Sequence, residues 1–405
     1  MRFKTGVLAL LLLFSGVVYG DAVILHSTDA GLTWTSEASN CSQHLNDVSS
    51  WKLGNAVAVG DNGTILVRNS QTNVWVDKSI PGITEDLNSV MFTLAGAKFW
   101  AGGENGRLLY SSDWGNTWHI ATSAPFTINC LWTDPNSTSA IILGGANGQL
   151  YSTTQGWLSS GTTEDLYAFA GHRCRTLPDW AFGNNGTCTG NYSGYPSYSG
   201  GNTAFRGATK VASGGLPIVA CGAKGAIYRI NHPHPMSSVS SGTTANLYAV
   251  AYSADCNSEE VYITVGSSGT ILRSTNLGVS WNSVFSGTTR QLNGVSSWGT
   301  ATTDIYVVGN SNTSCGIGII SDESTDTHSG LQASATTGTG MLTVRAENST
   351  VTVELFDMSG RRVENSQAST EAGQAHFSFS VPRGIYVYQA SSGAETISGK
   401  LVISQ

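Results

Sequence analysis

The sequence predicts an all-β fold: a seven-bladed β-propeller, with N-terminal strands closing the last blade, followed by a small C-terminal β-sandwich. Three observations lead to this prediction. A Gly-x-x-Gly turn between two apolar strands recurs along most of the chain. A further short strand precedes each copy of the turn. The 48 glycines, against 9 prolines, together with many β-branched and aromatic residues, are typical of short strands joined by tight turns.

The Gly-x-x-Gly copies define a repeat. Its second glycine falls in turn at Gly63, Gly106, Gly148, Gly186, Gly225, Gly269 and, after a short insertion, Gly316. The preceding first strands begin at Leu45, Leu87, Ile128, Leu166, Phe205, Leu247 and Leu292. They start 38 to 45 residues apart, which is the period of a propeller with about four strands in each unit. The copy at Gly186 matches poorly, so six or eight blades are the alternatives to seven.

The two ends of the repeat region complement each other. The last repeat runs out near Ser321, after its third strand, and the segment AVILHSTDAGLTW near the N-terminus has the pattern of a repeat's end. We therefore expect residues 22–43 to complete the blade that begins at residue 291. Such an overlap closes the ring and removes the exposed sheet edge that an open array would leave.

Three repeats carry the pattern Ser-x-Asp-x-Gly-x-Thr-Trp between their third and fourth strands. The short Asp or Asn side chain can bind N–H groups of its own turn, the glycine allows a positive φ, and the tryptophan packs between sheets. We interpret the pattern as structural rather than catalytic. Its residues are Asp29, Gly31 and Trp34 in the first box, Asp113, Gly115 and Trp118 in the second, and Asn276, Gly278 and Trp281 in the third.

The combined unit, Val-Gly-x-x-Gly-x-Ile-x-x-Ser-x-(Asp/Asn)-x-Gly-x-(Thr/Ser)-Trp, resembles the repeat of the photosystem II assembly and stability factor propellers, within the larger class of BNR/Asp-box proteins. The resemblance covers residues 22–321 and implies the fold rather than one activity. Members with this repeat include exported surface proteins of non-photosynthetic bacteria. The photosynthetic members carry an arginine patch, whereas the arginines here are few and scattered, which argues against a photosystem role.

The N-terminus has the pattern of an export signal. A positively charged start and an apolar run from Gly6 to Phe14 precede small residues at Val18 and Gly20, so residues 1–20 are predicted to be a signal peptide. The run is too short to span a membrane, and we expect no transmembrane segment in the mature chain. Export implies an oxidising compartment, in which the nearest pair of the seven cysteines, Cys174 and Cys188, could form a disulfide.

The C-terminal part of the chain has a different character. Residues 322–340 are rich in Ser, Thr and Gly and are expected to be a flexible linker between the propeller, residues 21–321, and a β-domain, residues 341–405. This domain resembles the C-terminal sorting domain of type IX secretion cargo in the segments Val351–Val363, Pro382–Val387 and Lys400–Ile403. The resemblance implies a β-sandwich that the secretion machinery recognises, and a secreted or cell-surface destination outside the outer membrane. An ordinary immunoglobulin-like accessory domain is the alternative.

Composition and motifs exclude several functions. The net charge of −7 argues against nucleic acid and anionic membranes as partners. No cysteine pair has the spacing of a zinc site, and we expect no metal or cofactor. A sialidase would need three arginines around its substrate's carboxylate. The candidate arginines are instead expected at equivalent positions of third strands: Arg68, Arg107, Arg229 and Arg273.

Two groups of residues are candidates for binding. Four polar residues immediately precede first strands and should lie on the channel rim: Asp86, Asp165, Asn246 and Gln291. Tyr192, Tyr195 and Tyr198 lie in a Gly- and Ser-rich loop that could stack on sugars or pack on a protein. We therefore expect a monomeric, non-enzymatic propeller that binds a protein or glycan. The alternatives are a glycoside hydrolase that uses rim carboxylates and a purely structural surface module.

Overall fold

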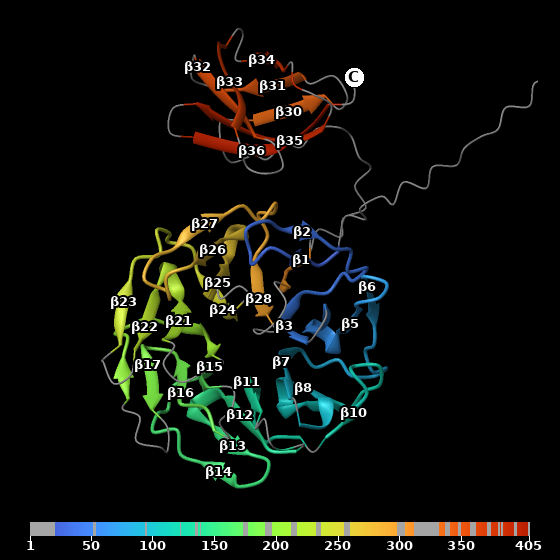
Figure 1. The fold of residues 1–405 in the computed structure, drawn as a ribbon, viewed down its shortest axis with the longest axis vertical. Helices are drawn as coiled ribbons and strands as arrows, with labels where there is room; N and C mark the ends of the chain where they lie inside the picture. Colours follow the sequence, from blue (N-terminus) through green and yellow to red (C-terminus); the bar gives the residue numbers. More distant parts are fainter. Residues whose placement is uncertain are drawn as a thin grey trace, which may run out of the picture. The chain divides into compact units, whose positions relative to one another are not determined.

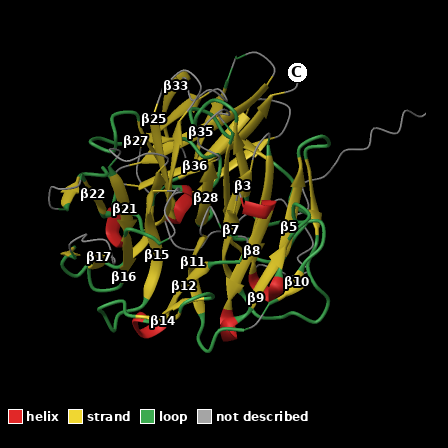
Figure 2. Cartoon of the chain, turned by 60° about the horizontal axis from the view of Figure 1, so that its bottom comes forward, coloured by secondary structure: helices red, strands yellow, loops and turns green. Residues whose placement is uncertain are grey.

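The computed structural model describes residues 21–403, apart from residues 52–53, 94, 122, 134–136, 138, 173–176, 191–196, 212–216, 232–235, 255–259, 298–303, 312–331, 337–340, 347–349, 357–361, 371–373, 380, 382–383 and 393–394. Two compact units divide the chain, Met1–Cys315 and Gly316–Gln405. Strands dominate both units, and short 3-10 turns are the helical elements of the described residues (Figure 2).

The first unit is a ring of seven four-stranded antiparallel blades around a central channel (Figure 1). We number the blades by the order of their innermost strands. From the channel outward, the first blade has β3 (Leu45–Trp51), β4 (Asn55–Gly60), β5 (Ile65–Asn69) and β6 (Val74–Asp77), the second has β7 (Leu87–Thr93), β8 (Lys98–Gly103), β9 (Leu108–Ser111) and β10 (His119–Ile120), and the third has β11 (Ile128–Thr133), β12 (Ile141–Gly145), β13 (Leu150–Ser152) and β14 (Gly156–Leu158). The fourth blade has β15 (Leu166–His172), β16 (Trp180–Gly183), β17 (Thr187–Gly190) and β18 (Tyr198–Ser199), and the fifth has β19 (Phe205–Ala208), β21 (Ile218–Gly222), β22 (Ile227–Ile230) and β23 (Ser237–Val239). The sixth blade has β24 (Leu247–Ala254), β25 (Glu260–Gly266), β26 (Ile271–Ser274) and β27 (Asn282–Val284), and the seventh has β28 (Leu292–Ser297), β29 (Ile305–Gly309), β1 (Ile24–Ser27) and β2 (Thr35–Ser36). In the fourth blade, β20 (Lys210–Val211) adds a parallel strand beside β15.

The seventh blade confirms the predicted closure by N-terminal strands, but β1 is its third strand, the place predicted for the segment that ends near Ser321. Its outer half comes from the N-terminus, because β1 pairs antiparallel with β29, with Leu25 opposite Val307. Its inner half, β28 and β29, comes from the far end of the repeat region. The ring is therefore held shut by a complete sheet, and neither β1 nor β29 presents an unpaired edge.

Close backbone contacts explain the Gly-x-x-Gly pattern. The turns between second and third strands include η1 (Asp61–Gly63), η3 (Glu104–Gly106), η4 (Ala146–Gly148), η5 (Ala223–Gly225) and η6 (Ser267–Gly269). A Cβ on Gly60 would lie 1.9 Å from the carbonyl oxygen of His44, which precedes the same blade's innermost strand. Gly63 has φ +67°, and its Cβ would lie 2.5 Å from the Ile83 carbonyl oxygen in the loop to the next blade. No side chain fits at either position.

Every innermost strand carries a β-bulge at the same place. The pairing register shifts between the first and third residues of the strand in all seven blades. A bulge leaves one residue out of the ladder and can turn its side chain in a new direction. The bulged residues are Asn46, Asn88, Asn129, Tyr167, Arg206, Tyr248 and Asn293, and all seven line the channel.

The three Asp boxes fasten the second, sixth and seventh blades to the blade before each. Asp29 Oδ1 accepts hydrogen bonds from Ser27 Oγ at 2.8 Å and Thr33 N at 2.9 Å, and Asp113 and Asn276 form the same turn. Burial opposes ionisation of Asp29, but these hydrogen bonds outweigh it and lower its pKa. Gly31 has φ +81° and packs against Ile263 of the preceding blade. This geometry supports a structural role for the boxes.

The predicted equivalence of the four arginines is wrong for two of them. Arg229 lies opposite Val219 and Arg273 opposite Ile263, and each donates from Nε to a backbone carbonyl of the next blade's Asp box, at 2.7 and 2.8 Å. Arg68 lies one residue further along its strand, where an Asp box has its serine. Arg107 precedes its strand altogether and caps η3. A single-residue offset turns a strand side chain to the opposite face.

Arg68 belongs to a polar cluster that spans the closing seam between the seventh and first blades. Its guanidinium, 3% exposed, binds both carboxylate oxygens of Glu37 at 2.7 and 2.8 Å. Trp75 Nε1 also donates to Glu37, and His26 lies between Glu37 at 3.0 Å and Asp304 at 2.9 Å. Burial opposes ionisation of Glu37, yet these donors lower its pKa to about 2. Burial also disfavours charged His26, but the two carboxylates outweigh it and raise the pKa of His26.

The second unit is a two-sheet β-sandwich. One sheet has the order β30 (Gln332–Thr336), β31 (Met341–Arg345) and β34 (Gln374–Ser378). The other has the order β33 (Arg362–Ser369), β32 (Thr350–Phe356), β35 (Gly384–Ser392) and β36 (Glu395–Ile403). Alternate side chains of these strands meet in one apolar core that includes Val344, Val353, Leu355, Phe377 and Tyr388. The predicted fold class is confirmed in both units. The predicted linker, residues 322–340, is wrong at residues 332–336, because β30 pairs with β31 and belongs to the sandwich.

Replacing Gly106 by Ala should destabilise the propeller strongly. The new Cβ would sit 1.7 Å from the Ala124 carbonyl oxygen at φ +70°, so we expect a loss of at least about 3 kcal/mol in the free energy of unfolding. Gly82→Ala is the matched control, because φ is +88° there but nothing lies within 4 Å, and it should cost about 1–2 kcal/mol. Urea unfolding measures both. Equal losses would contradict the close-contact explanation.

Replacing Glu37 by Gln should weaken the closing seam by about 3 kcal/mol at neutral to mildly acidic pH, since buried Arg68 loses its counter-ion. With a folded pKa of about 2 against 4.5 unfolded, Glu37 stabilises above pH 4.5, and this contribution is lost as pH falls toward 2. The raised pKa of His26 stabilises below 6.5 and this contribution is lost at higher pH. Thermal unfolding across pH should show a flattened acid limb in Glu37→Gln and an unchanged one in Glu104→Gln, an exposed control.

Candidate binding site at the mouth of the channel

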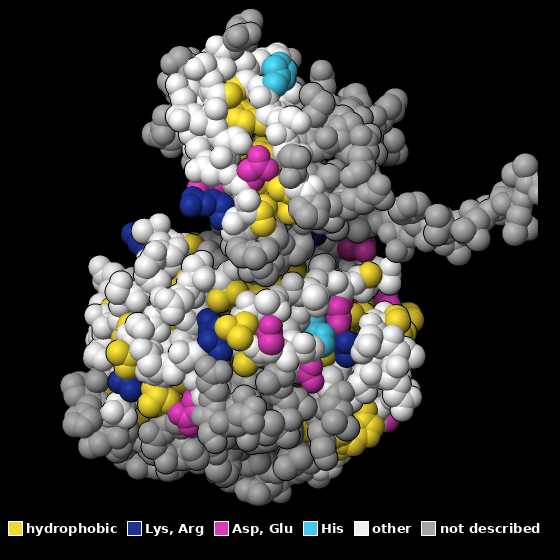
Figure 3. Space-filling model, turned by 45° about the horizontal axis from the view of Figure 1, so that its top comes forward, with side chains coloured by type: hydrophobic (Ala, Val, Ile, Leu, Met, Phe, Trp, Pro, Cys, Tyr) yellow, Lys and Arg dark blue, Asp and Glu magenta, His cyan; other side chains and the backbone are white. Residues whose placement is uncertain are grey.

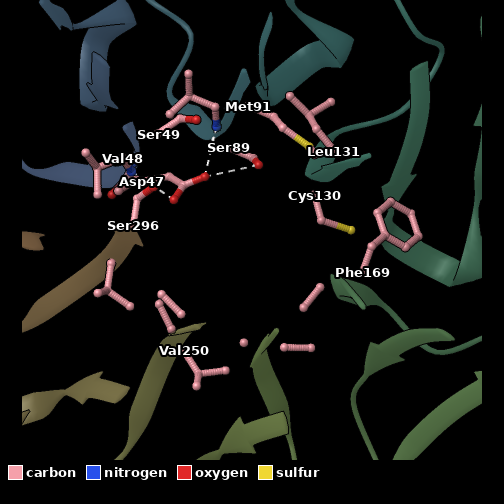
Figure 4. Close-up of a pocket in the computed structure, with 18 of the residues that line it drawn as sticks. Asp47, Val48, Ser49, Ser89, Met91, Cys130, Leu131, Phe169, Val250 and Ser296 are labelled. Carbon is pink, nitrogen blue, oxygen red and sulfur yellow. Dashed lines mark hydrogen bonds between the residues drawn. The ribbon is translucent and has the colours of Figure 1, made fainter. Parts of the chain in front are cut away.

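The central channel forms a cavity among the described residues. It encloses about 800 Å³ and is lined by the innermost strands of all seven blades. Figure 4 shows Val48, Leu131, Phe169 and Val250 on different strands of its wall. Asp47 is its acidic lining residue, and that carboxylate accepts hydrogen bonds from Val90 N at 2.9 Å and Ser89 Oγ at 3.2 Å (Figure 4).

Three of the four residues predicted for the channel rim bind turns of the preceding blade. Asp86 Oδ1 accepts from Asn62 N at 2.8 Å, and Asp165 Oδ1 accepts from Asn147 N, also at 2.8 Å. Asn246 Oδ1 accepts from Lys224 N at 2.9 Å, and His44 Nδ1 accepts from Ser311 N at 3.0 Å at the seam. Gln291 instead donates to Asn293 Oδ1 at 2.7 Å. The structure therefore places Asp86, Asp165 and Asn246 at three different blade junctions and Gln291 within its own blade, and does not gather the four at one point.

A chain of asparagines runs around more than half of the channel mouth. Each of these bulged residues donates from Nδ2 to the backbone carbonyl of the first residue of the next innermost strand. The four bonds are Asn293 to Leu45 at 2.8 Å, Asn46 to Leu87 at 3.2 Å, Asn88 to Ile128 at 3.0 Å and Asn129 to Leu166 at 3.1 Å. These amides link the seventh, first, second, third and fourth blades to one another.

The asparagine chain ends at the fourth blade, where three larger residues take its place. Tyr167, Arg206 and Tyr248 are the bulged residues of the fourth, fifth and sixth blades and are all half-buried. The Arg206 guanidinium carbon lies 4.0 Å from the centre of the Tyr167 ring, a cation–π contact. Tyr167 OH donates to Asp165 Oδ2 at 3.2 Å, so the predicted rim residue Asp165 orients the aromatic ring under the arginine.

These three residues were not among the sequence candidates, although the sequence contains a signal for them. In the aligned first strands LNDV, LNSV, INCL, LYAF, FRGA, LYAV and LNGV, the second letter is Asn in four and Tyr, Arg and Tyr in the other three. In a regular strand, side chains alternate between the two faces, so the second residue would point away from its neighbours on either side. The bulge breaks this alternation and turns the second residue toward the channel, which the sequence alone does not show.

The predicted tyrosine loop is only partly described. Tyr192 and Tyr195 lie outside the described residues. Tyr198 lies on β18, the outermost strand of the fourth blade, where it pairs with Cys188 and stacks on Trp180 at 6.5 Å. Cys188 is a buried free thiol, so the structure does not show the disulfide considered with Cys174, itself outside the described residues.

Charge is sparse on the described surface. Figure 3 shows one face on which uncharged side chains dominate and charged ones are scattered singly or in small groups. Within the described ranges, His, Cys, Asp and Glu form no group of three placed to hold a metal ion. No helix in that part of the chain has the length and apolarity that crossing a membrane requires.

Comparison with known proteins identifies the role of the C-terminal unit. Residues 338–404 match the secretion system C-terminal sorting domain. This sorting domain directs secretion and cell-surface attachment through a type IX system, so the protein is secreted or located at the cell surface.

The propeller is similar to a solved structure described as "YCF48 bound to D1 peptide". The TM-score is 0.50 with 13% identical residues, over 66% of this chain and 92% of that chain. At this identity the likeness shows the fold alone, and it agrees with the repeat resemblance in the sequence. No curated protein matches the chain by sequence.

Substitutions at Asp165 should separate its acceptor role from its charge. Asp165→Ala leaves the Asn147 N–H and Tyr167 OH without their acceptor and should lower the free energy of unfolding by about 1–2 kcal/mol. Asp165→Asn keeps an acceptor oxygen for the Asn147 N–H and should cost less than half as much. Urea midpoints of the two variants provide the test, and equal losses would show that the charge, not the hydrogen bond, matters.

Proposed function

We propose that this protein is an exported, non-enzymatic binding module whose propeller binds a protein partner through the mouth of its channel. The observation that carries the proposal is the interruption of the asparagine chain by Tyr167, Arg206 and Tyr248. In four blades, the bulged residue is an asparagine that donates a hydrogen bond to the next blade. The remaining three present aromatic rings and a guanidinium at the cavity. Tyr and Arg are the side chains that most often dominate binding energy at protein interfaces.

Two further observations support this proposal. The similar propeller was solved with a peptide bound, as its title states, so this fold can hold a peptide. In addition, a secreted or surface protein with a sorting domain at its C-terminus meets its partners outside the cell, and the type IX machinery is itself a partner of that domain. A binding role at the cell surface agrees with the peptide-bound propeller and with the sorting domain.

The engagement of the rim carboxylates favours binding over hydrolysis. A glycoside hydrolase places two carboxyl groups on opposite sides of one scissile bond. Here Asp86 and Asp165 cap turns of different blades, the first and the third, and Asp165 also holds Tyr167. These hydrogen bonds give both carboxylates a structural role, so their positions are explained without a catalytic one. The two-carboxylate hydrolase remains the competing function for experiment to decide.

The proposal is tested by screening the purified full chain on peptide and glycan arrays, with a turnover assay on the same sugars. We expect peptide binding without turnover, and a loss of about tenfold or more in affinity for Tyr248→Ala, because the ring contributes contact area at the mouth. Tyr198→Ala is the matched control, since that tyrosine lies on an outermost strand. It should leave affinity unchanged.

The other outcomes each overturn part of the proposal. Turnover that disappears in Asp165→Asn would make the protein a glycosidase. Glycan binding that depends on Tyr198 would move the site to the outer loop. Binding of neither peptide nor glycan would favour a structural surface module.

A further inference from the structure

Arg206 differs from the other arginines whose side chains the structure describes. Six of them donate hydrogen bonds to a protein acceptor: Arg68 to Glu37, Arg107 to Glu85, Arg229 to Leu277, Arg273 to Ala30, Arg290 to Asp21 and Arg362 to Glu354. Arg206 has a cation–π contact with Tyr167 and no hydrogen-bond acceptor among the described residues. A guanidinium carries five N–H donors, so Arg206 retains its donors for a ligand.

Arg206 also lines the channel, so its unused N–H donors lie at the cavity where a ligand would bind. It is the cationic residue that lines the channel, in a chain whose net charge is −7. The acidic lining residue, Asp47, belongs to the first blade, and its carboxylate is already bound by Val48 N, Ser89 Oγ and Val90 N. Arg206 is half-buried, and a partly desolvated charge without a counter-ion is unfavourable. An anion at the channel mouth would relieve this cost.

The stacking on Tyr167 also preorganises the guanidinium. The guanidinium carbon lies over the ring, 4.0 Å from its centre, and Asp165 fixes the ring through its hydroxyl. A cation–π contact uses none of the N–H donors in a hydrogen bond, and the planar edge of a guanidinium matches a carboxylate in a bidentate arrangement. Tyr248, the bulged residue of the neighbouring sixth blade, supplies a second aromatic side chain at the same mouth.

The surrounding residues favour a peptide over a sugar as the carrier of the anion. A glycan presents many hydroxyl groups and needs several free amide or carboxylate partners. One Nδ2 donor of each asparagine amide at the mouth is already bound to a backbone carbonyl, which holds that amide to the frame. Beyond the mouth, the wall presents Phe169 and Val250, which suit an apolar side chain (Figure 4). A single guanidinium also matches the single charge of a carboxylate better than the higher charge of a phosphate.

We propose that Arg206 recognises a carboxylate of a peptide ligand at the channel mouth, next to an apolar side chain of that ligand. This proposal rests on the proposed function and names the chemistry that the site selects. The carboxylate can come from an Asp or Glu side chain or from a peptide's C-terminus, and the experiment distinguishes these two sources.

The experiment uses the full chain and synthetic peptide libraries in four forms, which combine Glu or Gln at a fixed position with a free or amidated C-terminus. Dissociation constants are measured by fluorescence anisotropy. We expect affinity to fall about 10- to 100-fold when the recognised carboxylate is converted to its amide, because a hydrogen bond to a charged group is lost. Loss on Glu-to-Gln exchange assigns a side-chain carboxylate, and loss on amidation assigns the C-terminus.

Variants of the protein provide the second arm. Arg206→Gln should bind acidic and neutral peptides equally weakly, and Arg206→Lys should recover part of the preference, since it keeps the charge and loses the planar fork. Arg362→Gln is the control, because it removes the same charge from the C-terminal unit. It should leave every affinity unchanged.

The outcomes separate this proposal from the proposed function. Equal binding of acidic and neutral peptides that still requires Tyr248 would overturn carboxylate recognition and leave the binding function intact. Peptide binding that is insensitive to both Arg206→Gln and Tyr248→Ala would overturn both. Preferential binding of uronic-acid glycans that is lost in Arg206→Gln would retain the carboxylate and overturn the peptide as its carrier.

Discussion

The antiparallel pairing of β1 with β29 is the interaction on which the rest of this propeller depends. It joins residues 24–27 to residues 305–308 and converts a row of blades into a ring. The inter-blade contacts at the channel mouth can run around the circle only after this closure, since Asn293 reaches from the seventh blade to Leu45 of the first. The seam is further secured by Arg68 and Glu37, whose ion pair crosses the junction between these two blades. The channel and its mouth are therefore products of closure rather than of any single blade.

The repeated frame was predictable because each of its features rests on local geometry that the sequence repeats. The start of every innermost strand agrees with the apolar residue after a turn, from Leu45 to Leu292. The first glycine of the turn is required by a backbone contact in all seven blades, and the second by one in the first six; the predicted seventh, Gly316, lies outside the described residues. Closure was predictable as well, because the chain's start completes the last repeat. A sorting domain at the C-terminus was predictable from its own motifs, which residues 338–404 match.

The candidate site was much less predictable. Asp165 was identified from its place before a strand, but its role in capping a turn and holding Tyr167 depends on contacts between blades that no linear pattern specifies. Arg206 and its neighbours were missed because a bulge, invisible in the sequence, turns them to the channel. The seam cluster was also missed: Arg68 lies one residue away from the position at which Arg229 and Arg273 lie, and it meets Glu37 only in the closed ring. Interactions between distant segments decide all three cases.

The split seventh blade also determines when this protein can fold. β1 leaves the ribosome first, yet its partner β29 follows some 280 residues later, so the N-terminal strand must wait for nearly the whole propeller before it can pair. Contacts between residues so far apart in the sequence form slowly, because the intervening chain must lose conformational entropy before the pairing lowers the free energy. The ring therefore cannot be completed until the inner strands of the seventh blade are available to β1. The same strand order that closes the ring thus makes the completion of the fold a late event.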